Sequence, residues 1–276
     1  MSAAPPLAGV IGWPVGHSRS PAIHAHWLRR YGLPGWYVAL PTRPETAEAA
    51  LRALPALGFA GANVTIPHKE TALAVAETAT PLARRIGAAN TLIARDGALH
   101  ADNTDAHGFL ANLRAGAPAW RADAGPALVL GAGGASRAIV VALAESGAPE
   151  IRLANRTAER AEALAAEFGA PIRAIPWTEA EAAAAGATLI VNATSLGMAG
   201  GPPLAFCFDA AAPEAVATDI VYTPLETPFL RDAAARGLVT VDGLGMLLHQ
   251  AAPGFAAWFG REPEVDEAVR AAALGA

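Results

Sequence analysis

Cysteine and basic residues are scarce in this chain of 276 residues. Cys207 is the only cysteine, which excludes an internal disulfide and a metal site built from cysteines, so we expect a passive thiol. Asp and Glu number 25 against 20 Lys and Arg, which gives a net charge of −5. This acidic balance argues against nucleic acid or an anionic membrane surface as the main partner.

Long apolar runs and targeting signals are missing as well. The hydrophobic fraction is 53%, yet Glu, Arg and Gly interrupt the Ala-rich stretches before about 18 apolar residues accumulate. No basic region precedes the first apolar segment, so the pattern of a secretory signal is absent, and we expect a cytoplasmic protein. His24 and His26 are two residues apart on a predicted helix and point to different faces, which argues against a metal site. The G-x-S-x-G and G-x-x-x-x-G-K-[ST] motifs of other chemistries are also absent.

Strand-like and helix-like segments alternate along the whole chain, which predicts an α/β fold with open, mostly parallel sheets. Ser20 is expected to cap a helix that has Pro21 as its first residue and ends at Gly32. The tryptophans at positions 13, 27, 36 and 258 are expected in the core. Strands are predicted at residues 7–11, 36–40, 61–66, 128–130, 151–154, 188–192, 217–220 and 238–242, with a hairpin at 91–94 and 98–102. Helices are predicted at 44–54, from 67 on, at 105–115, 244–258 and 265–274.

A glycine-rich turn follows the apolar segment at 128–130, in the run Gly131-Ala132-Gly133-Gly134-Ala135-Ser136. A strand, a G-x-G-x-x-[G/A]-like turn and a helix form the context that binds a dinucleotide pyrophosphate. About twenty residues later, Asn155-Arg156-Thr157 and Arg160 occupy the region where an acid would bind the ribose of NAD. Because Arg156 and Arg160 offer charge to a 2′-phosphate, the sequence predicts NADP.

Four polar groups lie where predicted strands give way to helices, the usual ligand-binding edge of open α/β sheets. Ser18 and Ser20 place two hydroxyls beside a helix N-terminus, which suits a small carboxylate, although Ser20 could serve only as a cap. Lys69 lies in a first helical turn, where the helix dipole disfavours a cation, although a solvated surface lysine is the plain alternative. The other groups contain Asn90 and Asp105, and Asp105 could also be merely an N-cap.

Together these motifs resemble the shikimate dehydrogenase family over nearly the whole chain. Eight segments occur in family order: 12–21, 63–69, 90–91, 102–105, 131–137, 155–157, 192–195 and 242–247 followed by Gln250. The resemblance implies two open α/β domains with the active site in the cleft between them. Residues 1–104 and 243–276 would form the substrate domain, and residues 105–242 an inserted Rossmann domain for NADP. The sequence departs from the family pattern at Ala25 and at Ala106-His107, and neither departure affects a residue to which the resemblance gives a role.

The resemblance also implies residue roles. Lys69 and Asp105 would be the catalytic pair. Substrate would be bound by Ser18, Ser20, Thr65, Asn90, Asp105, Tyr222 and Gln250. NADP would be bound by Gly131, Ala132, Gly133, Gly134, Ala135, Asn155, Arg156, Thr157, Arg160, Thr194, Gly243 and Met246.

The implied reaction is the reversible reduction of 3-dehydroshikimate to shikimate in aromatic amino-acid biosynthesis. Reducing a ketone places a hydride on carbon and a proton on oxygen, and Lys69 can donate that proton or stabilise the developing charge while Asp105 orients it. Which of the two makes the proton transfer is open. The alternatives are a relative that prefers quinate or an amino analogue, and a non-catalytic nucleotide-binding regulator. The protein is expected to be a monomer or homodimer.

Overall fold

The computed structural model describes residues 4–275, which divide into two compact units. The first unit runs to Gly108 and resumes at Leu247, and the second is Phe109–Met246. The chain passes from one unit to the other inside helix α5 (Asp105–Gly116) and returns inside helix α9 (Leu244–Phe259). The sequence predicted both domain boundaries just before these helices, at 104/105 and 242/243, and those domain limits remain a prediction.

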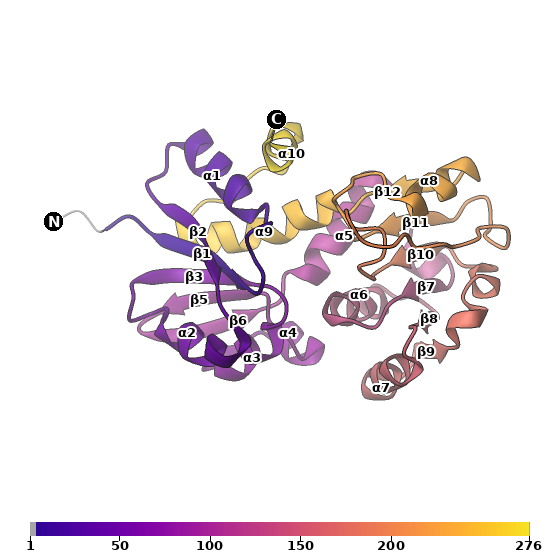
Figure 1. Ribbon diagram of the computed structural model, residues 1–276, viewed down its shortest axis with the longest axis horizontal. Coiled ribbons are helices and arrows are strands. Elements are labelled where there is room, and N and C mark those ends of the chain that lie inside the picture. The colour runs from indigo at the N-terminus through magenta and orange to yellow at the C-terminus, as the bar shows by residue number, and fades with distance from the viewer. Residues whose placement is uncertain (1–3, 276) are drawn as a thin grey trace. The chain divides into compact units, whose positions relative to one another are not determined.

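The first unit contains a six-stranded sheet with the strand order β2-β1-β3-β5-β6-β4 within the described residues. Figure 1 shows α1 and α10 on one face of this sheet and α2, α3 and α4 on the other. The strands are β1 (Leu7–Gly12), β2 (Trp36–Pro41), β3 (Phe59–Val64), β4 (Thr78–Ala79), β5 (Thr91–Arg95) and β6 (Ala98–Asp102). The helices are α1 (Ser20–Tyr31), α2 (Ala47–Ala53), α3 (Lys69–Val75), α4 (Pro81–Ile86) and α10 (Glu267–Leu274). The helix expected at 44–54 begins as a 3₁₀ turn, Pro44–Thr46, and β4 was not predicted.

The predicted hairpin is confirmed, because β5 and β6 pair antiparallel from Thr91 opposite Asp102 to Arg95 opposite Ala98. Its two turn residues, Asp96 and Gly97, have φ values of 52° and 78°. Two positive φ angles are what a two-residue turn needs to match the twist of its strands. The Asp-Gly pair supplies them at low steric cost.

The expectation that Ser20 caps α1 is wrong. Arg19 is the capping residue and makes no side-chain cap, while Ser20 is the first helical residue. The Ser20 N–H donates instead to the Ser18 hydroxyl, at 3.3 Å. The predicted end of the helix is confirmed, because Gly32 takes a left-handed conformation with φ 61°.

The second unit contains a parallel six-stranded sheet with the order β12-β11-β10-β7-β8-β9 in the described chain. The strand order reverses between β7 and β10, which marks the switch point where ligands bind in this type of sheet. Its strands are β7 (Ala127–Leu130), β8 (Ile151–Ala154), β9 (Ile172–Ile175), β10 (Leu189–Asn192), β11 (Val216–Asp219) and β12 (Val239–Val241). Its other helices are α6 (Gly134–Glu145), α7 (Ala158–Phe168) and α8 (Pro228–Ala235), and β9 was not predicted.

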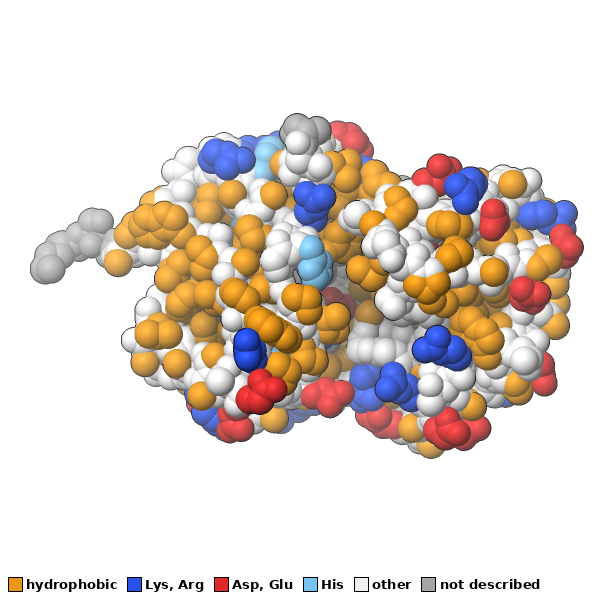
Figure 2. Space-filling model, in the orientation of Figure 1, with side chains coloured by type: hydrophobic (Ala, Val, Ile, Leu, Met, Phe, Trp, Pro, Cys, Tyr) orange, Lys and Arg blue, Asp and Glu red, His pale blue; other side chains and the backbone are white. Residues whose placement is uncertain are grey.

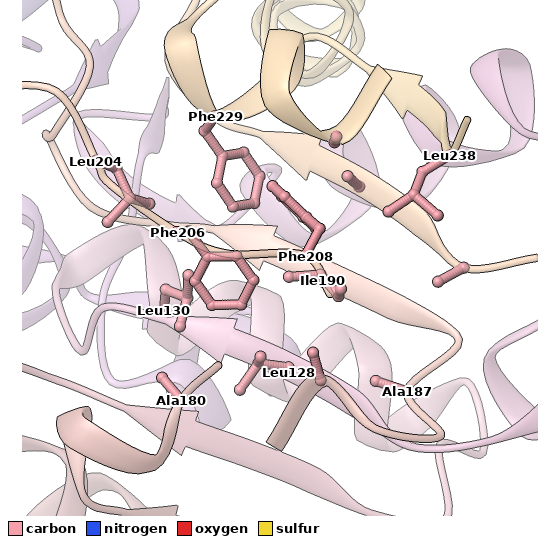
Figure 3. Packing of buried hydrophobic residues seen from close by; sticks show 14 of the residues in the cluster. Leu128, Leu130, Ala180, Ala187, Ile190, Leu204, Phe206, Phe208, Phe229 and Leu238 are labelled. Atoms are coloured by element: carbon pink, nitrogen blue, oxygen red, sulfur yellow. The ribbon is translucent and has the colours of Figure 1, made fainter. Parts of the chain in front are cut away.

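One apolar core of the second unit lies between α8 and its sheet. Figure 3 shows the rings of Phe206, Phe208 and Phe229 grouped over the strand residues Leu130 and Ile190. The ring centroids are 4.9–5.8 Å apart, in tilted or edge-on arrangements that aromatic pairs favour. This packing holds β7 and β10, whose carboxyl ends carry the glycine-rich turn and Thr194.

Two of the four tryptophans expected in the core are not buried. Trp27 and Trp258 are buried, but Trp36 is 58% exposed because β2 is an edge strand, and Trp13 is 40% exposed. Trp13 packs its ring against the guanidinium of Arg43. Figure 2 shows basic and acidic side chains interspersed over the face that it draws, with hydrophobic areas between them. Among the described residues no helix combines the length and apolar character needed to cross a membrane.

Candidate active site

Four polar segments meet at one edge of the first sheet. β1, β3 and β6 end there, and β5 begins there, because Asn63, Thr91 and Asp102 stand side by side in register. The segments that follow β1, β3 and β6 carry Ser18 and Ser20, Thr65 and Lys69, and Asn103 to Asp105, and Asn90 directly precedes β5. Strand pairing therefore collects side chains that are far apart in the sequence.

Lys69 and Asp105 form an ion pair in which Lys69 Nζ donates a hydrogen bond to Asp105 Oδ2. Their side chains are only 16% and 8% exposed. Lys69 is the first residue of α3 and Asp105 the first of α5, so two helix N-termini bring the groups together. Lys69 is also the only lysine in a chain whose other basic residues are all arginine. This matters because an ammonium group can transfer a proton to a substrate oxygen, whereas a guanidinium keeps its protons.

Asn90 connects the ion pair to the C-terminal part of the first unit. Its Nδ2 lies 2.9 Å from Asp105 Oδ1, 3.0 Å from Gln250 Oε1 and 3.0 Å from Thr104 Oγ1. Its Oδ1 accepts the Thr104 N–H at 2.8 Å, and the Thr104 hydroxyl donates to the Gln250 carbonyl at 2.8 Å. The structure thus brings together four predicted site residues, Lys69, Asn90, Asp105 and Gln250.

The remaining predicted substrate residues are placed separately. Ser18 and Ser20 hold each other through the bond described above, and Ser20 is buried. Thr65 directly follows β3, with its N–H donating to the Ile11 carbonyl at 2.8 Å. Within residues 4–275 no hydrogen bond joins Ser18 or Thr65 to the cluster of Lys69, Asn90, Asp105 and Gln250. Tyr222 is half-buried and belongs to the second unit.

The glycine-rich turn after β7 is shaped for a ligand. Gly131 has φ 108°, and a Cβ there would lie 2.9 Å from the Ala193 carbonyl, so a side chain is excluded. Gly133 and Gly134 are exposed, and a Cβ on either would meet nothing within 4 Å. The next residue, Ala135, lies in the first turn of α6, whose amides have no carbonyl partner inside the helix. Open space beside free N–H groups fits a pyrophosphate.

The segment after β8 lies beside this turn. Asn155 Oδ1 accepts the Ala132 N–H at 3.0 Å, and Asn155 Nδ2 donates to the Thr157 carbonyl at 2.8 Å. Arg156 and Arg160 are exposed, and the described chain offers neither of them an ion-pair partner. Two free guanidinium groups beside a turn that fits a pyrophosphate would suit a dinucleotide that carries a further phosphate.

A buried carboxylate organises the segment that follows β10. Asn192 Oδ1 accepts the N–H and the hydroxyl of Thr194, at 3.0 and 2.7 Å. Asn192 Nδ2 donates to Asp219, which also accepts the Thr227 hydroxyl at 2.7 Å. Asp219 is fully buried, and burial raises the pKa of its carboxyl. Gly243 and Met246, the last predicted cofactor residues, are both buried.

Comparison with known proteins gives the same assignment. Family models match for the shikimate dehydrogenase substrate binding domain over residues 10–92 and for shikimate / quinate 5-dehydrogenase over 119–198. A third model, the shikimate 5′-dehydrogenase C-terminal domain, matches 243–274. The chain is 61% identical over 270 residues to the shikimate dehydrogenase (NADP(+)) of Paracoccus denitrificans, covering 98% of this chain and 96% of that protein. The chain belongs to the shikimate dehydrogenase family.

Other known proteins are similar to this chain in sequence and in structure. The Rhodospirillum rubrum shikimate dehydrogenase (NADP(+)) is 59% identical over 274 residues, with 98% of this chain and 97% of that protein covered. The Thermus thermophilus enzyme, solved in complex with NADP(H) and shikimate, is 43% identical with a TM-score of 0.87, covering 98% and 99% of the two chains. A quinate dehydrogenase of Corynebacterium glutamicum, solved with NAD, is 30% identical with a TM-score of 0.91, covering 99% and 100%. The predicted family and fold are confirmed.

Sequence reasoning missed several polar residues that shape this family's site in the chain. Thr104 and Asn103 were noticed only as neighbours of Asp105, yet Asn103 Oδ1 accepts the Asp105 N–H at 3.1 Å. Asn192 and Asp219 were not singled out, although both are fully buried. A signal was available for Lys69 beyond its helix position, because it is the only lysine.

Proposed function

We propose that this protein is an NADP-dependent shikimate dehydrogenase, which reversibly reduces 3-dehydroshikimate to shikimate in aromatic amino-acid biosynthesis. The observation that carries the proposal is the Lys69–Asp105 ion pair in a member of this family, with Asp105 accepting from Asn90, whose Nδ2 also donates to Gln250. The high identity to shikimate dehydrogenases (NADP(+)) over nearly the whole chain supports the choice of substrate and cofactor.

The proposed substrate residues supply complementary groups. The hydroxyls of Ser18, Ser20 and Thr65 would bind the carboxylate and nearby hydroxyls, with Tyr222 completing the substrate residues. Asn90, Asp105 and Gln250 would bind the ring hydroxyls. We propose residues 1–104 with 243–276 as the functional substrate domain and 105–242 as the cofactor domain.

The proposed chemistry uses the ion pair at the carbonyl oxygen. When bound, NADPH supplies the hydride. Lys69 Nζ donates a hydrogen bond, and then a proton, to the oxygen as negative charge develops on it. Asp105 accepts from Lys69 and from Asn90, which holds the ammonium group in place and leaves the carboxylate oriented for a substrate hydroxyl.

The proposed cofactor residues divide by the part of NADP that they would hold. The turn residues Gly131, Ala132, Gly133, Gly134 and Ala135 would hold the pyrophosphate. Arg156 and Arg160 would bind the 2′-phosphate, with Asn155 and Thr157 shaping that loop. Thr194, Gly243 and Met246 would line the remaining cofactor surface.

We further propose that the enzyme acts in the cytoplasm as a monomer or homodimer, without nucleic acid as a partner. The acidic net charge of −5 supports the absence of nucleic acid, and a single cysteine suits a reducing compartment.

Steady-state absorbance of NADPH tests the function directly. Shikimate and quinate are each assayed with NADP and with NAD, and the highest kcat/KM should belong to shikimate with NADP. A preference for quinate or for NAD would establish the runner-up activity. No turnover with any pair would favour a nucleotide-binding regulator and refute the proposal.

Variants of Lys69 test the mechanism. Lys69→Ala should lower kcat by about 10²- to 10⁴-fold with a much smaller change in KM, the range for a positioned acid or base. Lys69→Arg keeps the charge but cannot release a proton, so a comparable loss would assign the proton transfer to Lys69. Arg52→Ala, which removes an exposed ion pair with Glu48 in the same unit, is the control and should retain activity. Near-normal turnover in Lys69→Ala would refute the role.

A further inference from the structure

Asp219 is a carboxylate in the interior of the second unit. It ends strand β11, and none of its surface is exposed. Asn192 Nδ2 and the Thr227 hydroxyl donate to its Oδ2 at 3.0 and 2.7 Å. The Val221 N–H donates to its Oδ1 at 2.9 Å. All three donors are neutral, so no opposite charge in this set offsets the cost of burying the carboxylate. A group that costs stability in this way is expected to serve another purpose.

The Asn192 side chain connects Asp219 to the segment that follows β10. Its Nδ2 donates one hydrogen to Asp219 and the other to the Leu196 carbonyl at 3.0 Å. Its Oδ1 accepts the N–H and the hydroxyl of Thr194, at 3.0 and 2.7 Å. Three of these four bonds go to the segment itself, and the fourth ties it to the neighbouring strand β11. Asp219 therefore anchors the amide from outside the segment and, because a carboxylate only accepts, keeps Nδ2 turned towards itself.

The bond to Asn192 decides what the Thr194 hydroxyl can offer a ligand. Asn192 Oδ1 carries no hydrogen, so the hydroxyl proton of Thr194 points to it. Thr194 Oγ1 also accepts the Leu196 N–H at 3.0 Å. A hydroxyl oxygen has two lone pairs, and the described residues supply no donor to the second. The hydroxyl of the half-buried Thr194 can therefore accept one more hydrogen bond, but it has no proton left to donate.

Thr194 lies beside the glycine-rich turn that follows β7. A Cβ on Gly131 would lie 2.9 Å from Thr194 Cγ2, and Asn192 stands opposite Leu130 in the paired strands. A dinucleotide held by this turn would therefore come close to Thr194. Phosphate oxygens are acceptors, which an oxygen lone pair repels, whereas the ribose hydroxyls and the carboxamide N–H of a nicotinamide dinucleotide are donors. The polarity of the Thr194 hydroxyl therefore favours one of these donors.

We propose that Asp219 is a positioning residue for the cofactor: through Asn192 it fixes the Thr194 hydroxyl as an acceptor for a ribose hydroxyl or the carboxamide N–H of NADP. The inference rests on the proposed function and adds to it a residue that does not itself touch the cofactor. Such a hydrogen bond holds the cofactor equally before and during the reaction. Its loss therefore weakens NADP binding and leaves kcat nearly unchanged.

The test measures the dissociation constant of NADP by titration calorimetry with the full chain. Asp219→Ala and Thr194→Val should each weaken NADP binding by about 3- to 10-fold, the effect of losing one neutral hydrogen bond. The double variant should bind NADP no more weakly than the weaker single variant, because both changes remove the same interaction. With saturating NADP, Thr194→Val should keep a kcat close to the wild-type value.

The 3-acetylpyridine analogue of NADP identifies the donor, because its acetyl group replaces the carboxamide and has no N–H. If Thr194→Val loses affinity for NADP but not for the analogue, the carboxamide is the donor. An equal loss for the two ligands assigns the bond to a ribose hydroxyl. Either result supports an accepting Thr194 hydroxyl, whereas wild-type affinity for both ligands refutes it.

Thr227→Val is the matched control. It deletes another donor to Asp219 and also the side-chain cap of α8, in which the Thr227 oxygen accepts the Leu230 N–H at 3.3 Å. The change therefore lowers stability at the same buried carboxylate but leaves Asn192 in place, and the variant should bind NADP like the wild type. If Asp219→Ala fails to fold, Asp219→Ala combined with Thr227→Val leaves no Thr227 hydroxyl without an acceptor. That variant should show the same loss relative to Thr227→Val.

The outcomes separate the two claims. A wild type that binds no NADP refutes the proposed function. If the wild type binds NADP but Asp219→Ala leaves the affinity unchanged, or Thr227→Val lowers it equally, the positioning role of Asp219 alone is overturned. Multiplicative losses in the double variant of Asp219→Ala with Thr194→Val would also overturn it, because Asp219 would then act independently of Thr194.

Discussion

Replacing His24 with Phe should make the protein less sensitive to acid. His24 is completely buried on α1, stacked on Tyr37 and flanked by Trp27 and Trp258 at centroid distances of 5.7 Å. Neither ring nitrogen has a hydrogen-bond partner among the described residues. Burial therefore disfavours the imidazolium and lowers the pKa of His24 from 6.5 to about 3.

The sign and size of the effect follow from this difference. Below pH 6.5 the unfolded chain takes up a proton on His24 while the folded chain does not, so stability falls as the pH drops from 6.5 towards 3. Each pH unit in that window costs about 1.4 kcal/mol. Between about pH 7.5 and pH 5 the loss from this one group is about 2 kcal/mol.

The assay is urea unfolding at about pH 7.5 and about pH 5, monitored by tryptophan fluorescence. His24→Phe keeps an aromatic ring on Tyr37 but cannot be protonated, so its free energy of unfolding should fall by about 2 kcal/mol less than that of the wild type. Any strain from the larger ring is the same at both pH values and cancels. Phe255→Leu changes the same aromatic cluster without removing a titrating group. It should lower the free energy of unfolding by the same amount at the two pH values. Parallel pH dependence in the wild type and His24→Phe would refute the reasoning.

Two further predictions concern the second unit. Arg156→Ala should weaken NADP binding about 10- to 100-fold through loss of one charge-assisted hydrogen bond and leave NAD use unchanged. Arg173→Ala, which removes an exposed ion pair with Glu150, is the control, and equal losses for both nucleotides would contradict the role of Arg156. Burial raises the pKa of Asp219 above 3.8, so the stability that it contributes is present below that pH and is lost as the pH rises. Asp219→Asn should therefore gain in urea-unfolding free energy relative to the wild type from about pH 4 to pH 7, and a constant or falling difference would count against this.

The sequence predicts most strands and helices here because its apolar segments alternate with turn residues. Where the expectation is wrong, the deciding contact is tertiary. Trp36 has the composition of a core residue, but the edge position of β2 leaves it exposed. Ser20 has the side chain of a helix cap, but it is the first residue of α1, and its N–H donates to the Ser18 hydroxyl at 3.3 Å.

The cofactor turn could be predicted from local residues, since one strand, one turn and one helix build it. The cluster of Lys69, Asn90, Asp105 and Gln250 could not be predicted from spacing. Asn90 and Gln250 are 160 residues apart, and only the family resemblance predicted that they share a site. Thr104 and Asn63 lay inside noted motifs, yet their importance comes from burial, which the sequence alone does not display. Local chemistry is therefore visible in the sequence, whereas a network assembled by strand register requires the fold.

The insertion of one unit inside the other has a consequence for synthesis on the ribosome. The sheet of the second unit is complete once Val241 has emerged, so this unit can fold while translation continues. The first unit must wait, because Trp27 Nε1 donates to the Glu264 carbonyl and Trp258 Nε1 to the Leu92 carbonyl. Its six strands are made before the second unit, but they lack the packing of α9 and α10 until residues 244–274 have been synthesised. The strands of the first unit are therefore synthesised before the second unit but complete their packing after it.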